Sequence, residues 1–219
     1  MKRPIKTGRR YETTGLVEGQ YQPRSHGRVL RNLLDITRKR EMDRTELVEQ
    51  LRAMAELVDR YDRDHRFTAD DICGIHRIWL GPVYAWAGKY RKVNLTKDDF
   101  PFAAASQVPR VMAEFEKNCL AKFTPCRSGS LEAIIRALAV VHTELVLIHP
   151  FREGNGRVAR MLASLMSLQA GLPALDFGGV RAWKRQEYFA AVQAGVRRDY
   201  RPMERIFTSV IRRTSRKRT

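Results

Sequence analysis

The chain has 219 residues and a mass of 25.3 kDa, which fits one domain with a sizeable core and argues against a second catalytic domain. Hydrophobic residues make up 43% and charged residues 30%, so the composition excludes a disordered chain, and no apolar run approaches the roughly 18 residues of a membrane-spanning helix. The formal net charge of +17 favours an anionic partner, whether nucleotide, nucleic acid, lipid headgroup or acidic protein, without choosing among them.

The chain carries no secretory or disulfide signal. Residues 1–10 are basic, but polar residues follow them where a signal peptide would continue with an apolar stretch, so we expect a cytoplasmic protein that does not bind membranes. Cys73, Cys119 and Cys126 form no C-x-x-C pair, and we expect reduced thiols rather than a disulfide framework or a cysteine-rich zinc site.

Two helices are predicted in the first third of the chain. The first begins at a capping-box-like segment, 43–46, and its apolar residues recur at spacings of three and four. These residues are Leu47, Leu51, Met54, Val58 and Tyr61. The second begins at 68–71 and ends at Gly81 and Pro82. The first helix is expected to be amphipathic and the second to be short.

One small hairpin is predicted next. Apolar residues alternate imperfectly over 89–96, residues 97–99 have the composition of a turn, and 100–102 return. Pro101 lacks an N–H donor and is therefore expected on an edge strand.

The remainder is predicted to be helical, over 105–123, 130–148, 157–170, 181–196 and 202–213. The helix over 130–148 is apolar around most of its circumference and should be the central, buried one. Gly171 is a natural helix stop. The expected fold class is therefore all-α, a bundle with one hairpin.

The loop after the central helix has the composition of a phosphate-binding site. Gly154 and Gly156 would let the backbone approach a phosphate, and Asn155 can donate to one of its oxygens at a helix amino terminus, where unpaired N–H groups attract anions. Arg157 and Arg160 lie three residues apart and can both reach this region. Together these residues predict a polyphosphate ligand.

Two further side chains of the loop supply chemistry. Glu153 is its only carboxylate and is the predicted ligand of Mg²⁺. His149 is the predicted general base for a substrate hydroxyl, and Phe151 is expected to anchor the loop in the core. Each residue singly has an ordinary structural explanation, such as a cap, a solvated carboxylate or a turn. Their combination in one short span favours a functional site.

These residues carry a resemblance to a known family. Residues 149–160 read His-Pro-Phe-Arg-Glu-Gly-Asn-Gly-Arg-Val-Ala-Arg and match every fixed position of the motif H-x-F-x-[D/E]-G-N-G-R-x-x-R, so the chain resembles the Fic family of protein adenylyltransferases. Residues 84–97 are similar to the family's stretch leading into its flap hairpin. The resemblance covers roughly 11–207 and implies a Fic-type helical bundle with one small β-hairpin flap.

The resemblance implies three segments and a reaction. Residues 1–40 would form an amino-terminal segment with an inhibitory helix, 41–213 the catalytic domain and 214–219 a basic tail. The enzyme would transfer AMP from ATP, with Mg²⁺ or Mn²⁺, to a Ser, Thr or Tyr hydroxyl of a protein target, its own chain included, and release pyrophosphate. His149 would accept the proton and Glu153 would hold the metal.

The resemblance also assigns the remaining contacts. The nucleotide-binding residues would be Arg152, Gly154, Asn155, Gly156, Arg157 and Arg160. The target would dock on the flap, at Lys97, Phe100 and Phe102. Many relatives carry an asparagine against the adenine where this chain has Val196, which leaves nucleotide preference open.

Residues 14–19, Thr-Gly-Leu-Val-Glu-Gly, are similar to the family's inhibitory motif, [S/T]-x-x-x-E-[G/N]. In this interpretation Glu18 pairs with Arg160 and blocks productive ATP placement, so that Glu18→Gly raises activity, and a reverse, AMP-removing activity is conceivable. Two alternatives stay open. One is a basic nucleic-acid-associated or toxin-like interaction module with a Fic fold and little transfer activity, and the other is a Fic fold locked off by Glu18.

Overall fold

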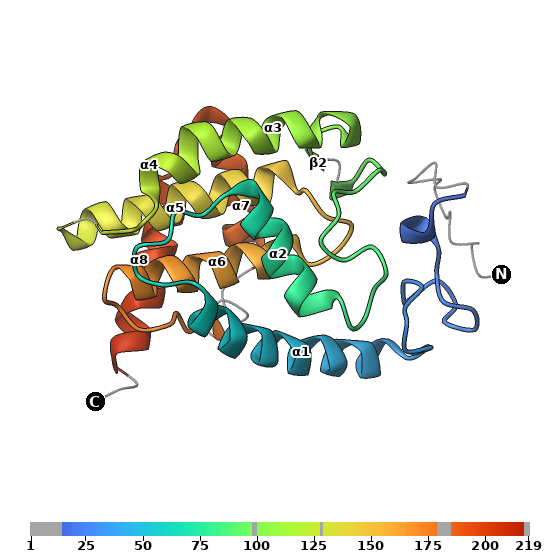
Figure 1. Ribbon diagram of the computed structural model, residues 1–219. Coiled ribbons are helices and arrows are strands. Elements are labelled where there is room, and N and C mark those ends of the chain that lie inside the picture. The colour runs from blue at the N-terminus through green and yellow to red at the C-terminus, as the bar shows by residue number, and fades with distance from the viewer. Residues whose placement is uncertain (1–14, 98–99, 128, 179–184, 217–219) are drawn as a thin grey trace.

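The computed structural model describes residues 15–97, 100–127, 129–178 and 185–216, which form a helical bundle with one two-stranded hairpin (Figure 1). The elements are η1 Val17–Gly19, α1 Lys39–Arg60, α2 Ala69–Leu80, β1 Thr96–Lys97, β2 Phe100–Pro101, η2 Ala105–Gln107, α3 Val108–Phe115, η3 Glu116–Leu120, α4 Ala121–Phe123, α5 Leu131–Ile148, α6 Asn155–Gln169, α7 Arg185–Ala194, η5 Gly195–Arg197 and α8 Arg201–Arg216. None of the described helices is long and apolar enough to cross a membrane. The expected all-α fold class is confirmed.

The centre of the bundle is α5, as its apolar circumference predicted. It packs against α6, α8, α3 and α7, while α1 and α3 lie along opposite edges of the molecule (Figure 1). The side-chain oxygen of Ser130 accepts a hydrogen bond from the Ala133 N–H at 3.2 Å and caps its first turn. The residues that follow Ile148 are therefore attached directly to the central helix of the bundle.

Helix α1 begins at Lys39, four residues before the predicted start, and buries a different face from the predicted one. The buried residues of this helix are Met42, Glu46, Ala53 and Leu57. Leu47, Leu51 and Val58, which were predicted on the apolar face, are 45%, 67% and 43% exposed. Of the five predicted residues, Tyr61 is buried and Met54 packs against the core. The prediction was wrong for the other three, because the buried stripe includes a charged and a small residue that a search for large apolar side chains does not find.

Helix α2 begins at the predicted segment 68–71, which forms a capping box. The Thr68 hydroxyl accepts from the Asp71 N–H at 3.1 Å, and the Asp71 carboxylate accepts from the Thr68 N–H at 2.9 Å. Gly81 follows the last residue of the helix, as predicted. The two ends of α2 are thus set by local signals.

The hairpin is shorter than predicted. Of the described residues, Thr96 pairs with Pro101 and Lys97 with Phe100, and the predicted turn residues 98–99 lie outside the described part of the chain. The stretch 89–95 is not a strand. Its backbone is held instead against the bundle, where the Arg91 N–H donates to the Pro150 carbonyl at 2.9 Å.

The later helices follow the predicted order with shifted ends. The predicted helix over 105–123 is an unbroken succession of η2, α3, η3 and α4, in which η3 is a π-helical turn. Helix α6 begins two residues earlier than predicted, and α8 ends three residues later. The first residues of the predicted helix 181–196 lie outside the described residues, and α7 with η5 accounts for the rest.

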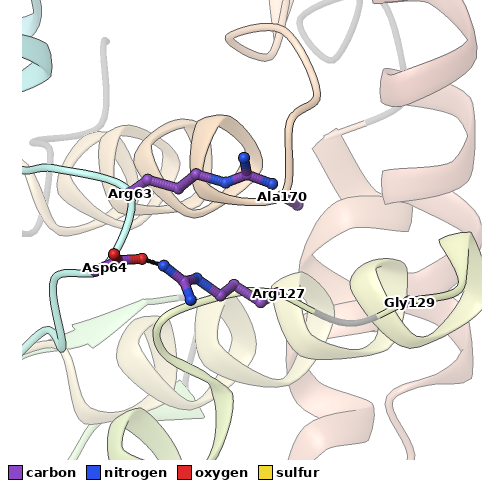
Figure 2. A pocket seen from close by; sticks show the side chains of 5 residues that line it. All are labelled: Arg63, Asp64, Arg127, Gly129 and Ala170. Atoms are coloured by element: carbon purple, nitrogen blue, oxygen red, sulfur yellow. Dashed lines mark ion pairs between the residues drawn. The ribbon is translucent and has the colours of Figure 1, made fainter.

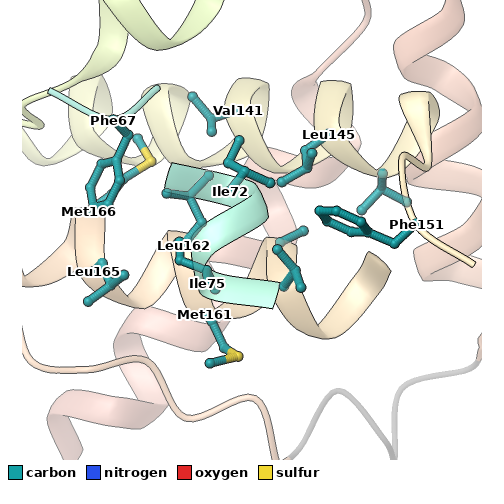
Figure 3. Close-up of a cluster of buried hydrophobic side chains, with 14 of the residues drawn as sticks. Phe67, Ile72, Ile75, Val141, Leu145, Phe151, Met161, Leu162, Leu165 and Met166 are labelled. Atoms are coloured by element: carbon teal, nitrogen blue, oxygen red, sulfur yellow. The ribbon is translucent and has the colours of Figure 1, made fainter. Parts of the chain in front are cut away.

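The core between α2, α5 and α6 ends at the loop that joins α5 to α6. Figure 3 shows Ile72 and Ile75 of α2 facing Leu145 of α5 and Leu162 of α6, with Phe151 at one end of the cluster. The Phe151 ring is fully buried, which confirms its predicted anchoring role. The loop that follows α5 is therefore fixed to the core by its third residue.

Candidate active site

The loop between α5 and α6 begins and ends with a left-handed residue. His149 follows α5 with φ 55° and ψ 56°, and Gly154 precedes α6 with φ 85°. A Cβ at Gly154 would also lie 2.7 Å from Cζ3 of Trp79, so both the backbone conformation and the packing require glycine there. The two reversals hold His149 and the amino terminus of α6 at one end of the bundle.

The Asn155 side chain closes this loop on itself. Its Oδ1 accepts from the Phe151 N–H, and its Nδ2 donates to the Phe151 carbonyl, both at 2.8 Å. We predicted that this amide donates to a phosphate, and the structure uses it to hold the loop. The Arg157 N–H donates to the Gly154 carbonyl at 2.9 Å, so the N–H groups of Asn155 and Gly156, at the amino terminus of α6, are the donors that would face a phosphate.

The His149 imidazole is arranged as a neutral base. Its Nδ1 lies 3.1 Å from the Val146 carbonyl, so Nδ1 carries the proton and Nε2 keeps its lone pair. The ring stacks on Phe102 with centroids 3.7 Å apart. Burial lowers the pKa of His149 to about 4, and the charges of Arg91 and Lys97 act in the same direction. The ring is therefore neutral at physiological pH, as a general base requires.

A second histidine, His76 of α2, packs against the loop. The sequence did not predict this role. It stacks on Phe151 with centroids 3.9 Å apart, its Nε2 donates to the Glu153 carbonyl at 3.1 Å, and its Nδ1 accepts from the Gly88 N–H at 2.7 Å. Burial lowers its pKa to about 3, so it stays neutral. Nothing in its sequence neighbourhood distinguishes it from an ordinary core histidine.

Arg157 is built into the bundle. Its Nη1 lies 2.6 Å from the Glu46 carboxylate, which is 3% exposed, and its guanidinium lies over the Trp79 ring, 4.5 Å from the centroid. The Tyr84 hydroxyl donates to the same carboxylate at 2.8 Å. The predicted phosphate ligand therefore joins α6 to α1, and Glu46 is a second residue that sequence analysis missed.

Glu153 is the exposed carboxylate of the loop. Its hydrogen bonds with described residues both engage Oε1, which accepts from the Gly154 N–H at 2.9 Å and from Arg157 at 3.3 Å. Among the described residues no group of three or more His, Cys, Asp or Glu could hold a metal by itself. A single carboxylate oxygen fits Mg²⁺ or Mn²⁺ that takes its other ligands from phosphate and water.

Arg160 lies beside the amino terminus of α6, since a Cβ at Gly156 would be 3.6 Å from its Nη1. Its charge acts on two buried groups, His142 and Tyr188, which contact each other through Nε2 and the hydroxyl at 2.7 Å. Arg160 therefore lies near the start of α6, and its contact with a phosphate stays a prediction. Val196 is 61% exposed in η5.

Glu18 is not where the inhibitory motif would place it. Its carboxylate accepts from the Lys92 N–H at 2.6 Å, and its carbonyl accepts from Arg152 Nε at 2.9 Å, so its hydrogen bonds with described residues do not involve Arg160. The described part of the motif contains the three-residue turn η1, and residues 1–14 of the segment expected to carry an inhibitory helix lie outside the described residues. Glu18 contacts the base of the hairpin at Lys92 and, within the described part of the chain, forms no hydrogen bond or ion pair with Arg160.

The flap closes against α7 and His149. Lys97 Nζ lies 4.5 Å from the ring centroid of Phe189, and Phe100 meets the same ring edge-on at 5.9 Å. Of the three predicted docking residues, Phe102 contacts His149, whereas Lys97 and Phe100 contact α7. The hairpin therefore meets the loop through Phe102, and target docking stays a prediction.

A separate hollow of about 690 Å³ lies at the other end of α5 and α6 (Figure 2). Arg127 points toward Asp64, with which it forms an ion pair, and Arg63 points toward Ala170. Gly129 precedes α5 and Ala170 follows α6, so the lengths of both helices, roughly 25 Å at 1.5 Å per residue, separate this hollow from His149.

This geometry defines a helical-bundle protein with a glycine-containing loop at the amino terminus of α6 and a neutral histidine at the start of that loop. The Fic/DOC family model matches residues 66–167, and the chain belongs to this family. It is 31% identical over 153 residues to a protein adenylyltransferase Fic of Nematostella vectensis, covering 69% of this chain and 34% of that protein. It is also 31% identical over 144 residues to a probable protein adenylyltransferase of Sinorhizobium fredii, covering 65% and 72%.

The fold agrees with solved structures. The crystal structure of BepC, a VirB-translocated effector of Bartonella tribocorum with bound AMPPNP, matches with a TM-score of 0.68 at 21% identity, covering 91% of this chain and 96% of that one. The chain spans about a third of the length of the Nematostella relative.

Proposed function

We propose that the protein is an adenylyltransferase that moves AMP from ATP to a hydroxyl side chain of a protein. The observation that carries the proposal is the neutral His149, with Nε2 as acceptor, beside the open N–H groups of α6 and Arg160. The relatives named as adenylyltransferases and the AMPPNP held by BepC support it.

The reaction balances with these groups. The hydroxyl oxygen forms a bond to the α-phosphorus while the bond from that phosphorus to the bridging oxygen breaks, and pyrophosphate leaves. His149 Nε2 takes the hydroxyl proton. Most of the catalysis is then positioning and charge stabilisation, supplied by the Gly154–Gly156 backbone and by Arg160.

A divalent cation fits beside Glu153. When bound, Mg²⁺ or Mn²⁺ would neutralise phosphate charge, and Glu153 would hold it through Oε2. Arg157 steadies this carboxylate from a position fixed by Glu46. Arg152 reaches toward Glu18, on the side of the loop that faces the flap.

The target would bind under the flap. Lys97, Phe100 and Phe102 line the cover of the site, so a target segment that carries Ser, Thr or Tyr would align along the hairpin. The chain itself is one such target, which makes self-modification an expected readout. The compartment, any reverse activity and any role of nucleic acid rest on the sequence alone.

The test follows label from ATP. Wild type and His149→Ala are incubated with α-labelled or γ-labelled ATP and Mg²⁺, with the exposed His26→Ala as matched control. Label in protein from the α position that disappears only with His149 supports AMP transfer. Label from the γ position alone would mean a kinase. No label, with salt-dependent nucleic-acid binding that survives His149→Ala, would favour the interaction-module alternative.

A further inference from the structure

A buried arginine connects the flap to the predicted base. Arg91 is 1% exposed and directs its guanidinium at four backbone carbonyls. They are the carbonyls of His149 at 2.6 Å, Val93 at 2.8 Å, Ala103 at 2.5 Å and Ile148 at 3.4 Å. Val93 precedes the hairpin and Ala103 follows it, so one side chain holds both arms of the flap and the residue that carries the base.

Among the described residues, Glu18 is the acidic group whose charge acts on Arg91. Burial lowers the pKa of Arg91 to about 10, and the charge of Glu18 opposes that effect, so the guanidinium stays positive at neutral pH. Glu18 is itself buried, at 7% exposure. A buried carboxylate is stable only with donors or an opposite charge nearby, and Glu18 has both.

Glu18 also ties the same parts together through its backbone. Its carboxylate accepts from the Lys92 N–H at the flap base, while its carbonyl accepts from Arg152 in the loop. The amino-terminal turn therefore contacts both the flap and the loop through Glu18. Arg91 contacts both through its buried guanidinium.

The backbone at His149 needs such support. Its φ of 55° is a left-handed conformation that residues with a Cβ adopt only when surrounding contacts hold it. Arg91 contacts the carbonyl of this residue and that of Ile148 before it. The direction of the imidazole then depends on the guanidinium.

We propose that Arg91, with Glu18 as its counter-charge, is a positioning residue that sets the orientation of His149 and the closure of the flap together. The proposal rests on the function proposed above. Arg91 does not reach the reacting atoms and acts through His149 and the flap. The proposal predicts that removal of Glu18 lowers activity, whereas the inhibitory motif predicts that it raises activity. The reason is that loss of Glu18 would loosen the site instead of opening it to ATP.

The experiment measures kcat and KM for ATP in Arg91→Met, Arg91→Lys and Glu18→Gln, with Arg110→Met as control because its ion pair with Glu114 is exposed. We expect Arg91→Met to lower kcat about 10- to 100-fold, the effect of a misplaced base, with KM changed less than about threefold. Arg91→Lys, which keeps the charge, should recover part of kcat. Glu18→Gln, the milder change, should lower kcat in the same direction.

Hydrogen exchange of the flap supplies a readout that does not depend on activity. We expect faster exchange in Arg91→Met and Glu18→Gln at two amides, the Phe102 N–H, which donates to the Leu95 carbonyl, and the Lys92 N–H. The exchange rates of both amides should be unchanged in Arg110→Met. Unchanged kcat and exchange in folded variants would overturn the proposal, and so would a higher kcat in Glu18→Gln. If wild type transfers no AMP, the proposed function fails and the exchange data alone decide the positioning role.

Discussion

The ring of Phe102 lies against the imidazole of His149, with centroids 3.7 Å apart and planes inclined by 15°. Phe102 directly follows β2, so the flap that would receive a target also covers the predicted base. A target hydroxyl that reaches Nε2 has to share or displace this contact. The burial of His149, and with it the pKa, therefore depends on where the flap lies.

Phe102→Ala is expected to raise the pKa of His149 from about 4 toward the ordinary 6.5, because burial is the main cause of the lowered value. NMR titration of the His149 ring measures it directly, and the acidic limb of kcat/KM against pH should move upward with it. Phe100→Ala is the matched control, since that ring contacts Phe189. A His149 titration that is identical in both variants would contradict the explanation by burial.

Glu46→Ala is expected to destabilise the fold by about 3–5 kcal/mol, because it leaves the Arg157 charge without its buried partner. The free energy of unfolding in urea measures the loss. Glu114→Ala is the control, since its ion pair with Arg110 is exposed on both sides and such pairs contribute about 0–1 kcal/mol. Similar losses in the two variants would show that Glu46 and Arg157 form no buried network.

The sequence predicted those parts of the fold that local signals specify. The apolar circumference of α5, the start of α2 at 68–71 and the end of α2 at Gly81 each depend on neighbours within one or two turns. The motif loop was likewise found because its chemistry lies within a few consecutive residues. These features agree with the structure because the residues that determine them lie close together in the sequence.

The parts that were missed depend on contacts between distant residues. Glu46 and Arg157 are 111 residues apart, Glu18 and Lys92 are 74 apart, and the Arg91 contact with His149 spans 58. The predicted face of α1 failed in part for the same reason, since the buried Glu46 has its side-chain partners, Tyr84 and Arg157, in distant parts of the chain. No periodicity or motif within α1 contains that information.

Gly154→Ala is expected to cost more stability than Gly171→Ala. Both glycines have positive φ, 85° and 77°, so each substitution carries a left-handed strain of about 1–2 kcal/mol. A Cβ at Gly154 would in addition lie 2.7 Å from Trp79, whereas nothing lies within 4 Å at Gly171, and such overpacking adds about 1–3 kcal/mol. Urea unfolding of both variants measures the difference. Equal losses would mean that Trp79 yields without cost.

Acid is expected to destabilise the protein through its buried histidines. Burial lowers the pKa of His76 and of His142 to about 3, while the unfolded chain titrates near 6.5. The unfolded state therefore binds more protons between these values, so the stabilisation is complete above pH 6.5 and is lost as pH falls toward 3. Urea midpoints at pH 7.5, 6, 5 and 4 should fall less steeply in His142→Gln than in wild type. His26→Gln, at an exposed site, should follow wild type, and parallel curves for all three proteins would rule out His142 as a source of the acid sensitivity.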